Sequence, residues 1–554
     1  MRVAELVLEI LAAHGVRHIF GVPGDAINDM TNALRTRDDM DFVLVRHEEA
    51  GAFAASATAK LTGKLAACMG TSGAGAIHLL NGLYDAKLDH APVIAITGQV
   101  ATEYVGTDYH QEVDLERLFS DVAVYSRTVM TESQLPGVML EACKAALAAP
   151  GVAHISLPTN LAGRDTKLER TDFAIGSELG EMRPCGPSMN EAVRLIDEAH
   201  AVAILAGIGA AGARQELLAL SRRLKAPIVR TLRAKDVIDE DEEACVGGLG
   251  LLGGAPGSAA MDGADLVIIV GADYPYVSFY PDTAKIVQIE PAPVRMGKRA
   301  PVAAPLRGHA KVTLQDLLSR VAEKPSDAFY RKIVEDKAKQ RRAWAKAETS
   351  DATPIRPQRL VAEVEKAAPD DAIFLADTGT STAWTARHLT VKEGQRFTLS
   401  SGLGSMAFSM AGAIGAQLAF PDRRVIAILG DGAFAMLMAD FVTAVRYELP
   451  IICVVLNNHK LGFIALEQES KGFPEHAIDL VNPDFVAVAK ACGGHGIAVE
   501  NPGKIAGAMA EALEAGVATV ISVEVDPGES IIPPKITLKQ AYQFGIAKTR
   551  ELFS

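Results

Sequence analysis

Residues 424–458 read RVIAILGDGAFAMLMADFVTAVRYELPIICVVLNN. The runs RVIAIL (424–429) and IICVVL (451–456) are typical of buried parallel strands, and a helix-length segment separates them. Asp431 follows the first run and Asn458 ends the second. Since the carboxyl ends of parallel strands meet at one edge of a sheet, where α/β folds bind ligands, we expect both side chains at that edge.

Asp431 and Asn458 offer the carboxylate and amide oxygens that Mg²⁺ prefers, with phosphate oxygens and water completing its octahedral shell. Gly430 and Gly432 allow backbone N–H groups to approach a diphosphate closely. A strand-to-helix turn capped by Asp431 is the simpler alternative. The paired asparagines at the end of the second run favour the metal site.

The composition limits the class of protein. A chain of 554 residues predicts about three or four domains, and its 49% hydrophobic and 22% charged residues are typical of a globular protein. The 55 Lys and Arg against 68 Asp and Glu give a net charge of −13, which argues against a nucleic-acid partner. The six cysteines are scattered without CxxC spacing, as in reduced cytosolic proteins.

The N-terminal run 1–24 has an amphipathic helical pattern with acidic residues, unlike a signal peptide. No stretch reaches the roughly 18 apolar residues needed to span a bilayer. We therefore expect a cytoplasmic protein.

Three segments of the chain alternate helix-like and strand-like runs. This alternation predicts an α/β protein with three doubly wound parallel-sheet domains, at residues 1–165, 188–320 and 354–554. The polar run 163–187 is predicted to be a linker. The charged run 331–348 predicts a solvated connecting helix.

A GDG turn followed at this interval by NN is the thiamine diphosphate signature. On this signature and the matches below, the sequence resembles the pyruvate oxidase and acetohydroxyacid synthase family over essentially its whole length. The resemblance implies, in chain order, a pyrimidine-binding domain, a central domain that binds FAD or a similar nucleotide, and a diphosphate-binding domain. It also implies that Asp431, Asn458 and the backbone carbonyl of Lys460 hold Mg²⁺.

The run VRHEEAGAFAASATAKLTG (45–63) resembles the family's proton-relay segment. By this resemblance Glu48 hydrogen-bonds N1′ of the thiamine pyrimidine and favours the tautomer that removes the C2 proton. A solvated glutamate at a helix start is the alternative for this residue type.

Three more runs of the first segment match the family: GVPGD (21–25), GTSGAGAIHLLNGL (70–83) and GTDYHQEVD (106–114). They imply cofactor-binding roles for Asp25, Gly73 and Asn81, and a catalytic role for Gln111. His110 stands where the family has phenylalanine. A side chain that can titrate near neutrality would therefore replace an apolar one next to the reacting carbon, and the substrate or the rate-limiting step would differ. Alternatively, His110 packs as an aromatic side chain.

In the third segment, ADTGTS (376–381) and SGLGSMAFSMAGAIGA (401–416) resemble turns that flank the cofactor. Met406 matches the apolar side chain that bends thiamine, and the small residues after it suit a helix packed close to the sheet. The cofactor-binding residues implied for this segment are Thr378, Gly379, Gly404, Ser405, Met406, Gly430, Gly432, Ala433, Leu461 and Gly462.

The middle segment carries GGLGLLGG (247–254) and GADYPYVSFYPDTAKIVQIEPAPVRMG (271–297), which resemble flavin-binding runs of pyruvate oxidases. The residues implied to line FAD are Gly250, Leu251, Leu252, Gly253, Ala272, Asp273, Tyr274, Pro275, Tyr276 and Glu290, the last bonded to a ribose hydroxyl. His309 stands where the family usually has aspartate. A carboligase could retain FAD as a structural relic, so flavin binding alone leaves two reactions open.

The run NNHKLGFIALEQE (457–469) carries Phe463 and Glu467, which match catalytic residues between thiamine and flavin in pyruvate oxidases. Acetohydroxyacid synthases often have a tryptophan in this region. The alternative for Phe463 is a core position in an amphipathic helix. The resemblance therefore implies oxidative decarboxylation of pyruvate or a close 2-oxo acid. The implied products are CO₂ and acetate or acetyl phosphate, with oxygen or a quinone as the electron acceptor.

Two alternatives stay open: an acetolactate-synthase-like, non-oxidative carboligase, and a non-catalytic thiamine-binding protein, which the intact Glu48, Asp431 and Asn458 disfavour. In the family these groups meet across a subunit boundary, which implies a homodimer or homotetramer. The C-terminal run 528–554 resembles the oxidase pattern and stops without the amphipathic tail of membrane-activated relatives. We therefore expect no stable membrane anchor.

Overall fold

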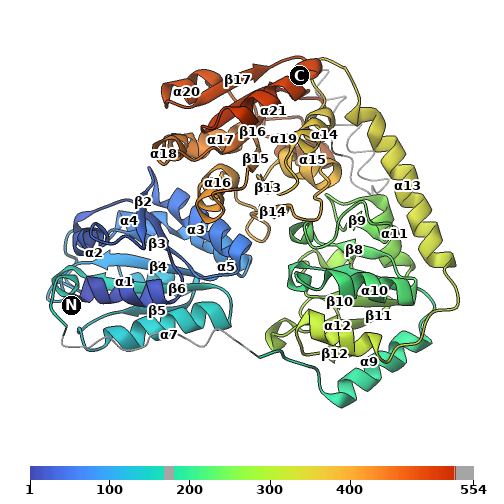
Figure 1. The fold of residues 1–554 in the computed structure, drawn as a ribbon, viewed down its shortest axis with the longest axis horizontal. Helices are drawn as coiled ribbons and strands as arrows, with labels where there is room; N and C mark the ends of the chain where they lie inside the picture. The colour runs from blue at the N-terminus through green and yellow to red at the C-terminus, as the bar shows by residue number, and fades with distance from the viewer. Residues whose placement is uncertain (167–179, 530, 532–554) are drawn as a thin grey trace.

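The computed structural model describes residues 1–166, 180–529 and 531. Within these ranges the chain forms three six-stranded sheets, and the neighbouring strands pair in parallel (Figure 1). The predicted α/β fold with three doubly wound domains is confirmed. Most of the predicted linker and of the predicted C-terminal run lies outside the described residues.

The first sheet has the strand order β2-β1-β3-β4-β6-β5. Its strands are β1 (His18–Gly21), β2 (Asp41–Leu44), β3 (Ala66–Gly70), β4 (Val93–Gln99), β5 (Ala123–Thr128) and β6 (Val152–Pro158). The helices are α1 (Val3–Ala13), α2 (Asn28–Leu34), α3 (Glu48–Thr62), α4 (Ala74–His78), α5 (Leu80–Leu88), α6 (Leu115–Phe119), α7 (Leu135–Ala148) and α8 (Thr159–Ala162). One face of the sheet packs on α1, α2 and α7, and the other on α3 and α5.

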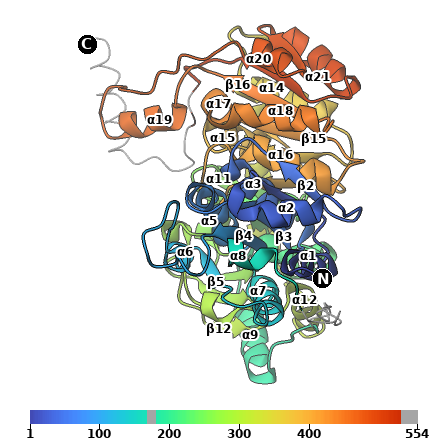
Figure 2. The ribbon, with the colours of Figure 1, turned by 90° about the vertical axis from the view of Figure 1, so that its left-hand side faces the viewer.

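The third sheet repeats this order, as β14-β13-β15-β16-β18-β17. Its strands are β13 (Ile373–Ala376), β14 (Arg396–Leu399), β15 (Val425–Gly430), β16 (Ile452–Asn457), β17 (His495–Val499) and β18 (Thr519–Glu524). The helices are α14 (Pro357–Ala367), α15 (Thr380–His388), α16 (Phe408–Ala419), α17 (Asp431–Leu437), α18 (Phe441–Arg446), α19 (Gly462–Ser470), α20 (Phe485–Ala491) and α21 (Ile505–Glu514). Helix α19 projects from the body of the domain (Figure 2).

The middle sheet has a different order, β12-β11-β10-β7-β8-β9. Its strands are β7 (Val202–Ala206), β8 (Ile228–Arg230), β9 (Cys245–Gly248), β10 (Leu266–Val270), β11 (Lys285–Ile289) and β12 (Ala304–Leu306). The helices are α9 (Gly186–Glu198), α10 (Arg214–Leu224), α11 (Ala255–Gly263) and α12 (Ala310–Leu318). Read from β9, the third strand in sequence is followed by the second, first, fourth, fifth and sixth, which is the order of dinucleotide-binding folds.

The predicted connecting helix is α13 (Ala328–Glu348), which runs along the outside from the middle to the third domain (Figure 1). Among the residues that the structure describes, no helix combines the length and apolarity needed to cross a bilayer.

The stretch 424–458 forms two adjacent parallel strands as predicted, with Gly430 of β15 opposite Leu456 of β16. The segment between them is broken into α17, a 3₁₀ turn (Met438–Asp440) and α18, where the sequence pattern indicated one helix-length element. At the break Asp440 Oδ1 accepts hydrogen bonds from Arg46 N at 2.7 Å and Thr443 Oγ1 at 2.8 Å. The break therefore connects this segment to the first domain.

The predicted cofactor turns lie at the switch points of the first and third sheets. In each of these sheets, the first strand lies between the second and the third, so the loops after the first and third strands face a common crevice. GVPGD (21–25) and GTSGAG (70–75) follow β1 and β3, and ADTGTS (376–381) and GDG (430–432) follow β13 and β15. Topology thus collects these four turns in two crevices.

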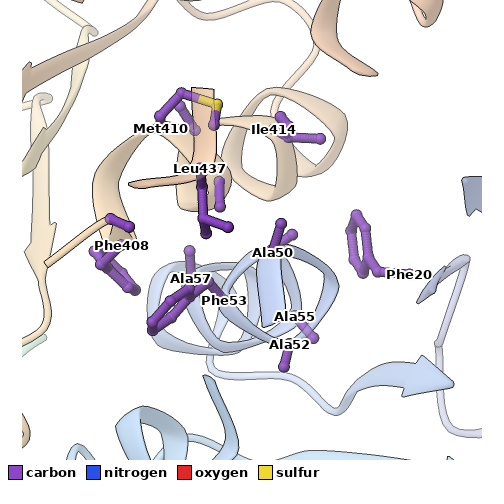
Figure 3. Packing of buried hydrophobic residues seen from close by; sticks show 14 of the residues in the cluster. Phe20, Ala50, Ala52, Phe53, Ala55, Ala57, Phe408, Met410, Ile414 and Leu437 are labelled. Carbon is purple, nitrogen blue, oxygen red and sulfur yellow. The ribbon is translucent and has the colours of Figure 1, made fainter. Parts of the chain in front are cut away.

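Helices α3 and α16 join the first and third domains into one shared core (Figure 3). A side chain at Gly415 of α16 would overlap the carbonyl oxygen of Ala54 of α3, so the helix backbones approach closely. Phe53 and Phe408 meet edge to face, with ring centroids 5.8 Å apart. The small residues of α16 were predicted to allow packing on the sheet, and they also allow this contact between domains.

We expect Gly415→Ala to destabilise the protein by about 1–3 kcal/mol, because the added methyl group forces α16 away from α3. Gly507→Ala is the matched control: Gly507 lies in α21 with no atom within 4 Å of an added Cβ, and alanine is the better helix former. The measurement is the midpoint of thermal unfolding. Equal midpoints for the two variants would contradict the tight contact.

Candidate functional site

Asp431 lies at the start of α17 and is buried, with 2% of its surface exposed. Gly432 N donates to its Oδ1 at 2.8 Å, and His459 N donates to its Oδ2 at 2.8 Å. The second bond joins Asp431 to the residue directly after Asn458, so the ends of β15 and β16 meet. Burial raises the pKa of Asp431, because the ionised carboxylate loses its contact with water. A cation beside the carboxylate would stabilise the ionised form.

Asn458 and Lys460 add two more oxygens near Asp431. Lys460 N donates to Asn458 Oδ1 at 3.3 Å, and the Lys460 carbonyl accepts from Gly462 N at 3.0 Å. A Cβ at Gly462 would lie 2.7 Å from Thr380 Cγ2, so a side chain there would displace Thr380. The carboxylate, amide and carbonyl oxygens of Asp431, Asn458 and Lys460 are of the kinds that a hard divalent cation such as Mg²⁺ binds.

Asn482 belongs to this cluster, although sequence reasoning missed it. Its Nδ2 donates to Asp431 Oδ2 at 2.7 Å and to Asn457 Oδ1 at 2.9 Å. Asn457 Nδ2 in turn donates to Glu524 Oε1 at 2.5 Å, at the end of β18. A chain of hydrogen bonds across two strands thus orients the Asp431 carboxylate.

Residues 400–407, which we call the strap, connect β14 to α16 and carry the predicted residues Gly404, Ser405 and Met406. The Met406 Cε would lie 3.3 Å from a Cβ at Gly432, so Met406 reaches the turn that holds Asp431. Just after the strap, in the first turn of α16, the N and Oγ of Ser409 both donate to Asp377 Oδ2 at 2.7 Å. Burial raises the pKa of Asp377 to about 6.

Asp377 is a second residue that sequence reasoning did not single out. It directly precedes the predicted Thr378 and Gly379, and its Oδ1 is buried without a hydrogen-bond partner among the described residues. Gly379, at φ 138°, adopts a conformation that glycine accommodates, and it precedes α15. The predicted ADTGTS turn therefore lies against the start of α16.

Glu48 is the first residue of α3 and is 7% exposed. His78 Nδ1 lies 3.0 Å from Glu48 Oε2, and the His78 ring stacks on His47 at 4.4 Å between centroids. A Cβ at Gly75 would lie 3.0 Å from Glu48 Oε1. The alternative of a solvated Glu48 is therefore wrong, and the carboxylate is buried beside His78, a histidine that the sequence alone did not indicate.

Asn81, Gln111 and His110 are further predicted residues on the loops and helices of the first domain. Asn81 Nδ2 donates to Glu49 Oε1 at 2.6 Å and to Ser405 Oγ of the strap at 3.0 Å. Gln111 has φ 64° and lies over Gly73, where a Cβ would meet the Gln111 carbonyl oxygen at 2.9 Å. His110 is exposed, which excludes packing in the core of this chain as its role.

Asp25 is exposed at the end of the GVPGD turn. Its Oδ1 accepts from Ala26 N at 2.9 Å and from Thr71 Oγ1 at 3.4 Å. These bonds connect the turns after β1 and β3 across the switch point. The predicted pyrimidine-binding turns are thus in contact.

In the middle domain the structure brings the two predicted flavin runs together. A side chain at Gly250 would overlap the Tyr274 hydroxyl, so the turn after β9 lies against the segment after β10. Arg299 Nε donates to Asp273 Oδ1 at 2.6 Å, and His90 and Arg299 hold the pKa of Asp273 below its usual range. Glu290 is buried, with Oε1 accepting from Ala292 N at 3.0 Å.

The turn after β9, which carries Gly250, also contacts the third domain. Arg387 Nη2 donates to the Leu251 carbonyl at 3.0 Å, and its Nε donates to the Leu252 carbonyl at 3.3 Å. Leu252 and Phe463 both pack against the core of the third domain, whereas Glu467 of α19 is exposed. A packing role for Phe463 is therefore present, and catalytic roles for Phe463 and Glu467 stay predictions.

The domains match known proteins in the order of the chain. The N-terminal thiamine pyrophosphate-binding domain of thiamine pyrophosphate enzymes matches residues 1–118, the central domain 189–317, and the C-terminal thiamine pyrophosphate-binding domain 377–523. The chain belongs to the thiamine pyrophosphate enzyme family. Thiamine pyrophosphate is thiamine diphosphate, so the cofactor class predicted from the GDG and NN signature is confirmed, and the assignment to pyruvate oxidases within this family stays a prediction.

Individual relatives of this thiamine enzyme have different names. It is 40% identical to the thiamine pyrophosphate-containing protein YdaP of Bacillus subtilis, over 98% of this chain and 95% of that protein. It is 35% identical to pyruvate oxidase of Lactiplantibacillus plantarum, over 84% and 78%. It is 34% identical to the acetolactate synthase large subunit of Parasynechococcus marenigrum, over 96% and 88%.

We expect Asn482→Ala to weaken Mg²⁺ binding about 10-fold or more, because Asp431 loses a donor that orients it. The measurement is a calorimetric Mg²⁺ titration at a fixed concentration of thiamine diphosphate. Asn501→Ala is the control, since Asn501 is exposed and its Oδ1 only accepts from Gly503 N at 2.9 Å. An unchanged Mg²⁺ affinity in Asn482→Ala would contradict this role.

Proposed function

We propose that this thiamine enzyme also uses Mg²⁺ and FAD to decarboxylate pyruvate, or a close 2-oxo acid, oxidatively to CO₂ and acetate or acetyl phosphate. The observation that carries this proposal is the contact between Gly250 and Tyr274 at the strand ends of a sheet with dinucleotide-binding order. The likeness to a pyruvate oxidase over most of the chain supports the same reaction.

In this proposal Asp431, Asn458 and the Lys460 carbonyl hold the metal, and Gly430 and Gly432 leave room for a diphosphate. When bound, thiamine diphosphate supplies a nucleophilic carbon and an electron sink for the loss of CO₂. Glu48, buried at the start of α3 with Oε2 3.0 Å from His78 Nδ1, would hydrogen-bond the pyrimidine ring and orient it.

Gln111 and His110 lie on an exposed loop, and Gln111 lies over Gly73; both would bind and orient the substrate. Gly250–Gly253, Ala272–Tyr276 and Glu290 would hold FAD, which when bound supplies the electron acceptor within the protein. Phe463 and Glu467 would control access between the two cofactors. Oxygen or a quinone would then take the electrons from the protein.

Non-oxidative carboligation, as in acetolactate synthases, is the second candidate. The observation that favours it is a match to the acetolactate synthase large subunit of Parasynechococcus marenigrum over 558 residues, longer than the 470 matched to pyruvate oxidase. Both reactions begin with the decarboxylation of a 2-oxo acid, so they share the residues around Glu48 and Asp431.

We expect the purified protein to show a flavin absorption band that pyruvate bleaches under anaerobic conditions, with oxygen or a soluble quinone restoring it. Acetate or acetyl phosphate should form in step with reduction of the acceptor. Absence of the flavin band would overturn the oxidative assignment. A flavin band that pyruvate does not bleach, with acetolactate as the product, would favour non-oxidative carboligation over the oxidative reaction.

We also propose that two chains complete each active site, in a homodimer or homotetramer. No hydrogen bond or ion pair between described residues joins Glu48 to Asp431, Asn458 or Lys460. Exposed apolar side chains occur in both of the domains that carry these groups, and such side chains are typical of surfaces that another subunit covers. They include Ile77, Tyr104 and Tyr109 in the first domain, and Met436, Ile464, Phe473 and Val481 in the third.

Mixing two inactive variants tests this arrangement. Glu48→Gln and Asp431→Asn should each abolish turnover, and co-expression of the two should restore about a quarter of the wild-type activity. Half of the randomly formed dimers are mixed, and one of the two sites in each mixed dimer is intact. A site built within one chain would give no recovery.

A further inference from the structure

The strap (residues 400–407) lies along helix α5 and is fixed at both ends of that helix. At the beginning of α5, Asn81 donates to Ser405 Oγ at 3.0 Å. Just after the end of α5, Asp89 accepts from three groups of the strap: Ser401 Oγ at 2.6 Å, Gly402 N at 2.9 Å and Ser401 N at 3.0 Å. Asn81 was predicted from the sequence to bind the cofactor, whereas no role was predicted for Asp89.

Asp89 is itself held by a buried cation. Lys60 of α3 has its Nζ 2.6 Å from Asp89 Oδ2 and 2.7 Å from Asp85 Oδ2, and it donates to the Leu399 carbonyl at 3.0 Å. Leu399 ends β14, immediately before the strap. The side chains of Lys60 and Asp89 are only 1% and 2% exposed, so water competes little for these bonds.

The Asp89 turn also touches the middle domain. Arg233 Nη1 donates to the Asp89 carbonyl, and its Nη1 lies 3.9 Å from Asp89 Oδ1. A Cβ at Gly402 would lie 2.8 Å from the Leu88 Cβ, so the strap has no room to slide along the end of α5. All three domains therefore meet at this point.

We propose that Asp89 is a positioning residue for thiamine diphosphate: held by Lys60, it fixes the strap so that Met406 reaches the turn of Asp431. This inference rests on the proposed function, in which Met406 and Ser405 contact the cofactor. Asp89 acts through the strap and touches no reacting atom. Its carboxylate matches the three donors of the strap and the Lys60 ammonium, and no neutral side chain of its size accepts from all four groups.

Asp89→Asn keeps the shape of the side chain and turns an acceptor into a donor that faces Lys60 or Ser401. We expect the dissociation constant for thiamine diphosphate to rise about 10-fold or more at saturating Mg²⁺, and kcat to fall, with little change in the KM for pyruvate. Calorimetric titration and steady-state kinetics measure these effects. Asp121→Asn is the matched control and should leave all three unchanged, since Asp121 pairs with Lys87 at 2.9 Å on the exposed surface of the same domain.

A purely structural role predicts a different result. If Asp89→Asn only lowers the folded fraction, kcat falls with that fraction while the dissociation constant of the remaining sites stays at the wild-type value, which would overturn the proposal. Wild-type protein that fails to bind thiamine diphosphate with Mg²⁺ would overturn the proposed function instead, and the inference with it.

Ser401→Ala provides a second, milder variant, because it removes one hydroxyl group from the strap side. It should raise the dissociation constant less than Asp89→Asn does, and the double variant should bind no more weakly than Asp89→Asn alone. Effects of the two substitutions that multiply independently would show that Asp89 does not act through the strap.

Discussion

The close approach of α3 and α16 is the constraint on which the rest of the structure depends. It requires Gly415, because any side chain there would overlap the Ala54 carbonyl. Helix α3 begins with Glu48, and α16 begins directly after the strap, so one helix contact fixes groups of the first domain relative to groups of the third. A looser contact would move Asn81 and Ser405 apart. Their hydrogen bond of 3.0 Å would then lengthen and weaken.

The sequence predicted those parts of the site that depend on local patterns. Asp431 and Asn458 could be placed because a buried parallel strand is a continuous apolar run, and such strands end at one edge of a sheet. Glu48 could be placed only through the family motif, since a glutamate at a helix start is usually solvated. Its burial comes from Gly75 and His78, which belong to another turn of the chain.

Residues that act through distant contacts left no such signal. Asn482 reaches Asp431 across 51 positions of sequence, and Asp89 reaches Ser401 across 312. In a sequence, Asp89 is a polar residue at the end of an amphipathic helix, which is typical of a solvent-exposed position. The break at Met438–Asp440 was equally hidden, because one of the hydrogen bonds made there comes from Arg46 of the first domain.

The strand orders explain why one fold class serves two kinds of ligand site here. In the first and third sheets the switch point lies between the first and third strands, and the two crevices collect turns with acidic and amide side chains. In the middle sheet it lies between β7 and β10, where Gly209 N donates to the Gly271 carbonyl at 2.9 Å and the chain continues into Ala272–Tyr276. Glycine at this crossing lets backbone approach backbone, and the aromatic residues that follow would supply apolar surface for the proposed flavin. In the proposed reaction, decarboxylation would use the first two crevices. The fate of the remaining fragment would then depend on how the third crevice is connected to them, through Arg387, Leu252 and the helix that carries Phe463.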